Sequence, residues 1–78
     1  MTECSVKLDS IDEVKEFCAL TNACKFDIDL ISGRYAVDAK SIMGIFSLDL
    51  TKTLKAVIHA DADKAEDFLD DAKKFIVE

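Results

Sequence analysis

The side chain whose sequence context points most clearly to a function is the Ser41 hydroxyl, because Ser41 directly precedes a dense run of apolar residues. A helix N-cap at this position would place the hydroxyl at the positive end of a short, very apolar helix. The apolar residues of that helix would form two sides. The first side consists of Ile45 and Leu48, and the second consists of Ile42, Met43 and Phe46. A small domain buries one such side easily, so the second side predicts a docking surface.

The other reactive side chains are three cysteines and one histidine. An odd number of cysteines, with no C-x-x-C pair and no secretory signal, indicates reduced thiols in a cytoplasmic protein. We expect Cys4 and Cys18 to be small buried hydrophobes and Cys24 to be partly exposed near a helix end. His59 lies too far along the chain to complete a metal site with the cysteines. With no Gly-rich phosphate loop and no nucleophile–base pair, we predict neither a cofactor nor enzymatic activity.

The composition describes one small, acidic domain spanning residues 1–78. Half of the residues are hydrophobic and 33% are charged, which is ordinary for a folded domain. The net charge of −6 and the pI of about 4.6 argue against nucleic acid or an anionic membrane as the main partner. The sequence has no apolar run long enough to span a bilayer.

Apolar periodicity predicts four strands and three helices. Alternating residues predict strands over 2–8, 26–30, 34–38 and 53–60. Ser10 and Glu13 form a capping box before a helix that should end near Asn22. The predicted buried stripe of that helix consists of Ile11, Val14, Phe17, Cys18 and Thr21. A turn at Ser32–Gly33 should join the second and third strands, with Tyr35 and Val37 pointing inward.

The last helix should begin near Asp61 and continue to the C-terminus with an apolar stripe. The resulting order is β-α-β-β-α-β-α. Four strands with one apolar face each predict an α+β open-faced sandwich, in which three helices cover one face of an antiparallel sheet. The uncovered face would then bear polar residues such as His59. One alternative function is therefore a small module that binds a ligand or assembles through this open face.

The segment Lys40-Ser41-Ile42-Met43-Gly44, followed by Ile45-Phe46-Ser47-Leu48, resembles the second-helix motif of the HPr family. These proteins are the phosphocarriers of the bacterial sugar phosphotransferase system. Ile58-His59-Ala60-Asp61 and Lys25-Phe26-Asp27-Ile28-Asp29 also resemble the family's final strand and second strand. The order of elements is that of the family as well. The resemblance implies an HPr-like fold and protein partners from the phosphotransferase system.

The resemblance also implies a phosphate-carrying histidine at the start of the first helix. Counting back from Lys25 places Asp12 at that position, and aligning the helix starts places Ser10 there. Neither residue is a histidine, and a phosphohistidine requires an imidazole nitrogen as nucleophile. We therefore predict a family member without a histidine carrier site. The alternative is a phosphocarrier that uses Asp12 or Ser10 as an unusual acceptor.

A second implied feature is regulatory phosphorylation of the serine that begins the second helix, which is Ser41 here. A phosphate at an N-cap would meet free backbone N–H groups. The competing interpretation is that Ser41 only caps the helix, a contribution of about 1 kcal/mol. In the family, the adjacent surface docks partner proteins. That surface corresponds to Ile42, Met43 and Phe46, so the expected partners are phosphotransferase-system proteins or a kinase.

One departure from the family pattern lies at the end of this helix. Asp49 stands where the family usually has a glycine. Asp tolerates a left-handed position less well than Gly, so we expect an altered helix end.

Overall fold

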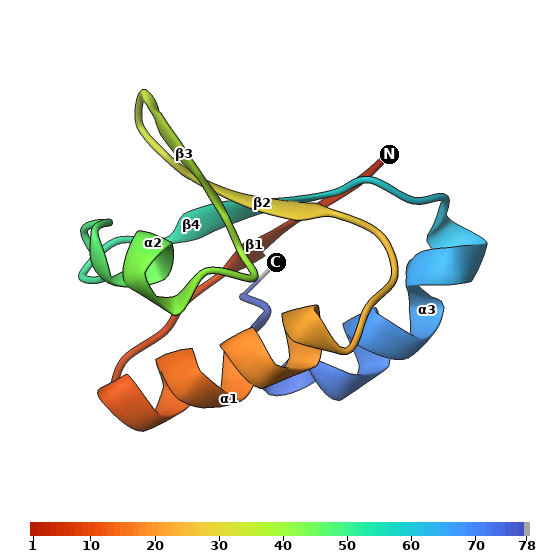
Figure 1. Ribbon diagram of the computed structural model, residues 1–78, viewed down its shortest axis with the longest axis horizontal. Coiled ribbons are helices and arrows are strands. Elements are labelled where there is room, and N and C mark those ends of the chain that lie inside the picture. The colour runs from red at the N-terminus through yellow and green to blue at the C-terminus, as the bar shows by residue number, and fades with distance from the viewer. Residues whose placement is uncertain (78) are drawn as a thin grey trace.

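The computed structural model describes residues 1–77 and confirms the predicted α+β open-faced sandwich (Figure 1). The strands are β1 (Thr2–Val6), β2 (Ile28–Ser32), β3 (Tyr35–Asp38) and β4 (Leu54–Ile58). The helices are α1 (Ile11–Asn22), α2 (Ile42–Phe46), α3 (Ala62–Asp71) and a short 3-10 helix, η1 (Lys73–Phe75). The antiparallel sheet has the order β1-β4-β2-β3, and the helices lie on one side of it. Within residues 1–77, no helix has the length and apolar character needed to cross a membrane.

Alternate side chains of each strand point toward the helices, and the register shows which ones share that face. Cys4 and Leu30 both pair with Ala56 of the central strand, so these three positions share the inner face. Phe17 of α1 is fully buried beneath that face. Its ring meets those of Phe68 and Phe75 edge-on, with centroids 5.9 Å apart in each pair. The three rings therefore join α1, α3 and η1 into one core.

The start of α1 has the predicted capping box with one difference. The Ser10 hydroxyl accepts a hydrogen bond from the Glu13 N–H at 3.1 Å, as expected. Glu13 Oε1 in turn accepts from the N–H of Asp9 at 2.7 Å, one residue before the N-cap. The first bond satisfies a donor that the helix start leaves free, and the second holds the residue before the cap; α1 ends at Asn22 as predicted.

The prediction that the last helix continues to the C-terminus is wrong. α3 ends at Asp71, and after η1 the chain turns to run antiparallel to β1. The N–H of Lys7 donates to the Phe75 carbonyl, and the N–H of Val77 donates to the Ser5 carbonyl, each at 2.9 Å. These bonds pair backbone groups on the outer edge of β1, which a continuing helix would have left exposed.

Several side chains differ from their predicted environments. Tyr35 was expected to point inward but is 68% exposed, because it lies near the tip of the β2–β3 hairpin, beyond the reach of the helices (Figure 1). The turn of that hairpin is Gly33–Arg34, and Gly33 adopts a φ of 61° that suits glycine. Cys4 is only half-buried, whereas Cys18 is buried and Cys24 is partly exposed as predicted. Val57 lies on the open face but is buried among its neighbours.

Candidate functional site

Ser41 caps α2, as the sequence predicted. Its side chain is exposed, and its Oγ accepts a hydrogen bond from the Gly44 N–H at 3.1 Å. Its carbonyl accepts from the Ile45 N–H at 3.0 Å, and its own N–H donates to the Asp38 carbonyl at 3.0 Å. The backbone of Ser41 is thus fixed on both sides, while its hydroxyl faces solvent at the positive end of the helix.

The segment before Ser41 is bound to the C-terminal half of α1. The fully buried Thr21 hydroxyl lies 2.7 Å from the Ala39 carbonyl and 2.9 Å from that of Cys18. Since a hydroxyl has one proton, the shorter contact identifies Ala39 as the preferred acceptor. The Asn22 amide donates to the Lys40 carbonyl at 3.0 Å. Two adjacent carbonyls ahead of Ser41 are therefore held by side chains that lie 18 residues earlier in the chain.

Lys40 adds two further connections to this region. Its N–H donates to Asp38 Oδ1 at 2.9 Å, and its Nζ donates to the Cys24 carbonyl at 3.0 Å. The Lys40 ammonium is therefore directed toward the end of α1 and not toward the Ser41 hydroxyl. The sequence motif around Ser41 thus has a structural role of its own, because it joins α1, β3 and α2.

Replacing Thr21 with valine is expected to lower the free energy of unfolding by about 1–3 kcal/mol. Valine keeps the shape of threonine but leaves the buried Ala39 carbonyl without its side-chain donor. Urea denaturation would measure the loss, and amide hydrogen exchange should become faster at Lys40 and Ser41. The matched control is Thr21→Ser, which keeps the hydroxyl. Equal exchange rates at Ser41 in both variants would contradict the proposed connection.

Gly44 allows α2 to lie close to its neighbours. A Cβ atom at this position would stand 3.3 Å from the Ser41 Oγ and 3.3 Å from the Val37 Cβ. Such contacts are tighter than ordinary van der Waals distances. The glycine thus keeps space around the Ser41 hydroxyl and permits close packing of α2 on β3.

The apolar residues of the α2 region separate into an inner and an outer group. Ile45 is fully buried and Leu48 is 8% exposed, so both anchor the helix as predicted. Met43 is 76% exposed and Phe46 is 39% exposed. Ile42 was expected to face outward with them, but it is partly buried against the core. The outer group is therefore narrower than the sequence indicated.

Ile11 extends this outer surface onto α1. The sequence placed Ile11 in a buried stripe, but it is 62% exposed. It lines a groove of about 580 Å³ that also includes Phe46, and this groove separates the start of α1 from α2. We call Ile11, Met43 and Phe46 the α2 patch. The signal that could have found Ile11 is its position as the first helical residue after the N-cap, where a side chain projects past the core.

The start of α1 holds the two residues that the resemblance placed at the phosphate-accepting position. Ser10 lines the same groove as Phe46, and its Oγ is engaged with the Glu13 N–H. Asp12 is exposed in the first turn. His59 follows β4 on the open side of the sheet, where its Nε2 lies 2.8 Å from Asp29 Oδ2. The only histidine of the chain is therefore not part of the groove at the start of α1.

The chain after α2 has Asp49 where the family usually has a glycine, and the end of the helix differs accordingly. α2 ends in a right-handed Ser47 with φ of −77°, and Asp49 lies two residues farther, in the loop. The Thr51 hydroxyl and the Thr51 N–H donate to Asp49 Oδ1 at 2.5 and 3.1 Å. These two bonds hold the pKa of the Asp49 carboxyl below its ordinary value, and the bond from the hydroxyl has the larger effect.

Replacing Thr51 with valine is expected to raise the pKa of Asp49 toward its ordinary value, because only the weaker backbone donor remains. A lowered pKa in the folded state contributes stability above the unfolded value, and that contribution is lost as pH falls through the folded pKa. Carboxyl-carbon NMR titration would measure the change, with the exposed Thr53→Val as the control. The explanation fails if both variants leave the Asp49 titration unchanged.

Fold and site together define a class of protein: a small open-faced sandwich with a serine-capped second helix beside the start of the first. Comparison with family models supplies the identity. The PTS-HPr model, described as the PTS HPr component phosphorylation site, matches residues 13–78. The protein belongs to the HPr family of the sugar phosphotransferase system. The match begins after Ser10 and Asp12, so it does not include the start of α1.

Three solved structures are similar to this chain in fold. HPr-C-His from Thermoanaerobacter tengcongensis is 23% identical with a TM-score of 0.76, and the alignment covers 95% of this chain and 92% of that one. HPr from Bacillus anthracis is 20% identical with a TM-score of 0.65, covering 90% and 94%. The catabolite repression protein Crh of Bacillus subtilis is 18% identical with a TM-score of 0.64, covering 94% and 88%. A search of curated proteins found no significant match.

Proposed function

We propose that this HPr-family protein acts by docking partner proteins on the α2 patch and is regulated by phosphorylation of Ser41, without passing phosphate from a histidine. The observation that supports this most directly is the placement of α2. Ile45 and Leu48 anchor the helix, Met43 and Phe46 are exposed, and the Ser41 hydroxyl faces solvent at the helix start. HPr-family proteins are phosphocarriers rather than enzymes, so we assign the protein no catalytic residue.

The composition at the start of α1 supports the absence of a histidine carrier. The chain has a single histidine, His59, and it is hydrogen-bonded to Asp29 on the open face of the sheet. The resemblance assigns either Asp12 or Ser10 to the family's histidine position, and neither is a histidine. The carboxylates of Asp12 and Glu13 add negative charge where a phosphoryl group would arrive. A phosphoryl group there would meet repulsion from these carboxylates, and the Lys7 ammonium in the same groove is already paired with Asp9.

The surroundings of Ser41 favour a phosphorylated form of this residue. Its Oγ already lies 3.1 Å from the Gly44 N–H, so a phosphate on that oxygen would have a backbone donor nearby. The hydroxyl is exposed and the Ser41 backbone is fixed, which makes the group accessible without unfolding. The added charge would change the edge of the α2 patch, so one modification could alter which partners dock there.

The first experiment tests the serine. The protein is incubated with an HPr kinase and ATP, and the site is located by mass spectrometry. We expect one phosphate on Ser41, and we expect none on Ser41→Ala. Ser47→Ala is the control, because Ser47 is an exposed serine at the other end of the same helix. Absence of phosphate on Ser41 in the unmodified chain would reduce the proposal to a docking role alone.

The second experiment tests the missing carrier site. Incubation with phosphoenolpyruvate and the first enzyme of the phosphotransferase system should give no acid-labile phosphate on the protein. Phosphate that disappears in Asp12→Asn or Ser10→Ala would establish the alternative, a carrier with an unusual acceptor. Phosphate retained in both variants would instead direct attention to His59, and His59→Gln would then be the decisive variant.

A further inference from the structure

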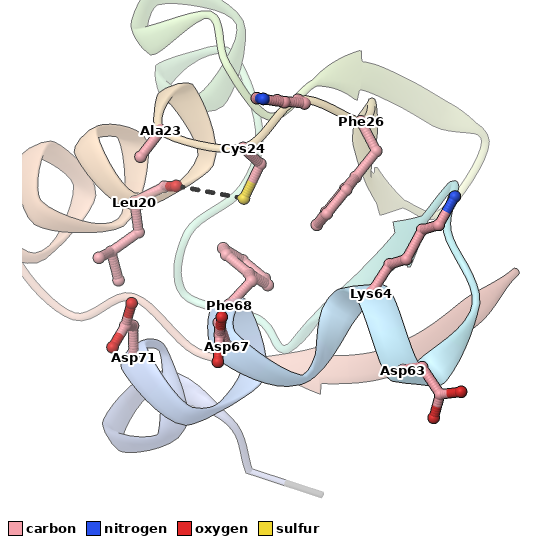
Figure 2. Close-up of a pocket in the computed structure, with 10 residues that line it drawn as sticks. Leu20, Ala23, Cys24, Phe26, Asp63, Lys64, Asp67, Phe68 and Asp71 are labelled. Carbon is pink, nitrogen blue, oxygen red and sulfur yellow. Dashed lines mark hydrogen bonds between the residues drawn. The ribbon is translucent and has the colours of Figure 1, made fainter.

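A second groove lies between α1 and α3, away from the α2 patch (Figure 2). It has a volume of about 670 Å³ and is bordered by the end of α1, the segment after it and one face of α3. Its apolar lining comes from Leu20, Cys24, Phe26 and Phe68. The Cys24 thiol donates to the Leu20 carbonyl, and burial raises the pKa of that thiol, so it lines the groove as a neutral group.

The charged rim of this groove is asymmetric. Asp63, Asp67 and Asp71 recur every fourth residue of α3, and none of them forms an ion pair with another residue of the described chain, 1–77. Figure 2 places Asp71 beside Leu20, Asp67 next to Phe68, and Lys64 near Phe26 at the other end. Two of the three carboxylates, Asp67 and Asp71, therefore lie toward one end of the groove, and Asp63 lies with Lys64 at the other.

The end of α1 strengthens the negative potential at the Leu20 side. A helix has partial negative charge at its C-terminus, and α1 has no basic residue in its last turn to offset that charge. Lys40 contributes one ammonium nearby, which keeps its positive charge while its Nζ donates to the Cys24 carbonyl on the α1 side of the groove. Lys25 also lines the groove. Both lysines belong to the α1 side of the groove, whereas Asp67 and Asp71 lie on α3 without an ion pair in the described chain, so the α3 wall is the part suited to a cation.

We propose that this groove binds a basic segment of a partner protein, with an apolar side chain between Phe26 and Phe68 and an arginine or lysine directed toward Asp67 and Asp71. An arginine suits both the aromatic and the acidic residues of the groove, because its guanidinium pairs with carboxylates and packs on aromatic rings. A second copy of this chain fits poorly, since each copy has a net charge of −6. This surface is independent of Ser41 and of the α2 patch.

The test is an NMR titration of the full, isotope-labelled protein with a short amphipathic peptide of leucine, alanine and arginine. We expect amide shifts concentrated at Leu20, Ala23, Cys24, Phe26 and Phe68. The double variant Asp67→Asn/Asp71→Asn should weaken binding about tenfold, as the loss of two rim charges would. Both side chains are exposed, so this variant should fold normally.

Two controls separate this site from general attraction to an acidic protein. Glu66→Gln/Asp70→Asn removes the same charge from exposed positions of α3 that do not line the groove, and it should leave affinity within about twofold. A peptide with glutamate in place of arginine should give no shifts. Equal weakening by the two double variants, shifts centred on Met43 and Phe46, or no shifts with the arginine peptide would each overturn the proposal.

Discussion

Replacing Phe17 with alanine is expected to remove about 3–5 kcal/mol from the free energy of unfolding. The Phe17 side chain is fully buried and makes edge contacts with both Phe68 and Phe75. Truncation loses the transfer free energy of the ring and leaves a cavity between three elements. A domain of 78 residues has a total stability of about 4–12 kcal/mol, so this single change would leave a marginal fold.

Urea denaturation at constant temperature measures this loss, with the midpoint falling while the slope stays the same. Tyr35→Ala is the matched control, because it also removes an aromatic ring but from a side chain that is 68% exposed. We expect its cost to stay within about 0.5 kcal/mol, as for other surface substitutions. Similar losses in the two variants would contradict the assignment of Phe17 as the centre of the core.

Much of this fold could be predicted because its local signals agree with its tertiary structure. The alternation that places Leu30 inward and Asp29 outward is visible in the sequence, and the register of β2 with β4 follows it. Ser10 with Glu13, and Ser41 before its apolar run, are capping patterns that need no tertiary information. The same two caps also define where each candidate site begins.

The errors concern residues whose environment depends on where an element ends. Tyr35 alternates correctly with Val37, but the sheet extends past the helices at its position. Ile11 has helical spacing with the buried stripe, yet it begins α1 beyond the core. Ile42 follows the cap of a helix only five residues long, and so short a helix has no continuous outer face. Periodicity in the sequence indicates which way a side chain points. Whether that side chain is buried depends on whether a neighbouring helix or strand extends far enough to cover it.

The hydrogen bonds between α1 and the segment before Ser41 could not be predicted from the sequence, for another reason. In the sequence, Thr21 and Asn22 indicate only where a helix ends. Their hydrogen bonds to the Ala39 and Lys40 carbonyls join residues that are 18 positions apart. No local pattern specifies such a pairing. In the structure, these bonds and that of the Lys40 ammonium to the Cys24 carbonyl hold the segment before Ser41 against the end of α1.

Replacing Met43 and Phe46 together with serine is expected to reduce kcat/KM for phosphorylation of Ser41 by an HPr kinase about a hundredfold. Both side chains are exposed in the free protein. Each would contribute about 1–2 kcal/mol on partial burial in a complex, and the sum corresponds to that factor. The loss should appear mainly in KM, because the serine and its helix cap are unchanged. Steady-state kinetics with purified kinase would measure it.

The control for this prediction is again at Tyr35, now replaced with serine. This change removes an exposed aromatic side chain outside the α2 patch, so kcat/KM should stay within about twofold of the parent. Urea denaturation of the double variant must also show a fold as stable as that of the parent to within about 1 kcal/mol. If stability is kept and phosphorylation is unaffected, Ser41 is recognised without the α2 patch. The exposed Met43 and Phe46 would then need another explanation than docking of the kinase.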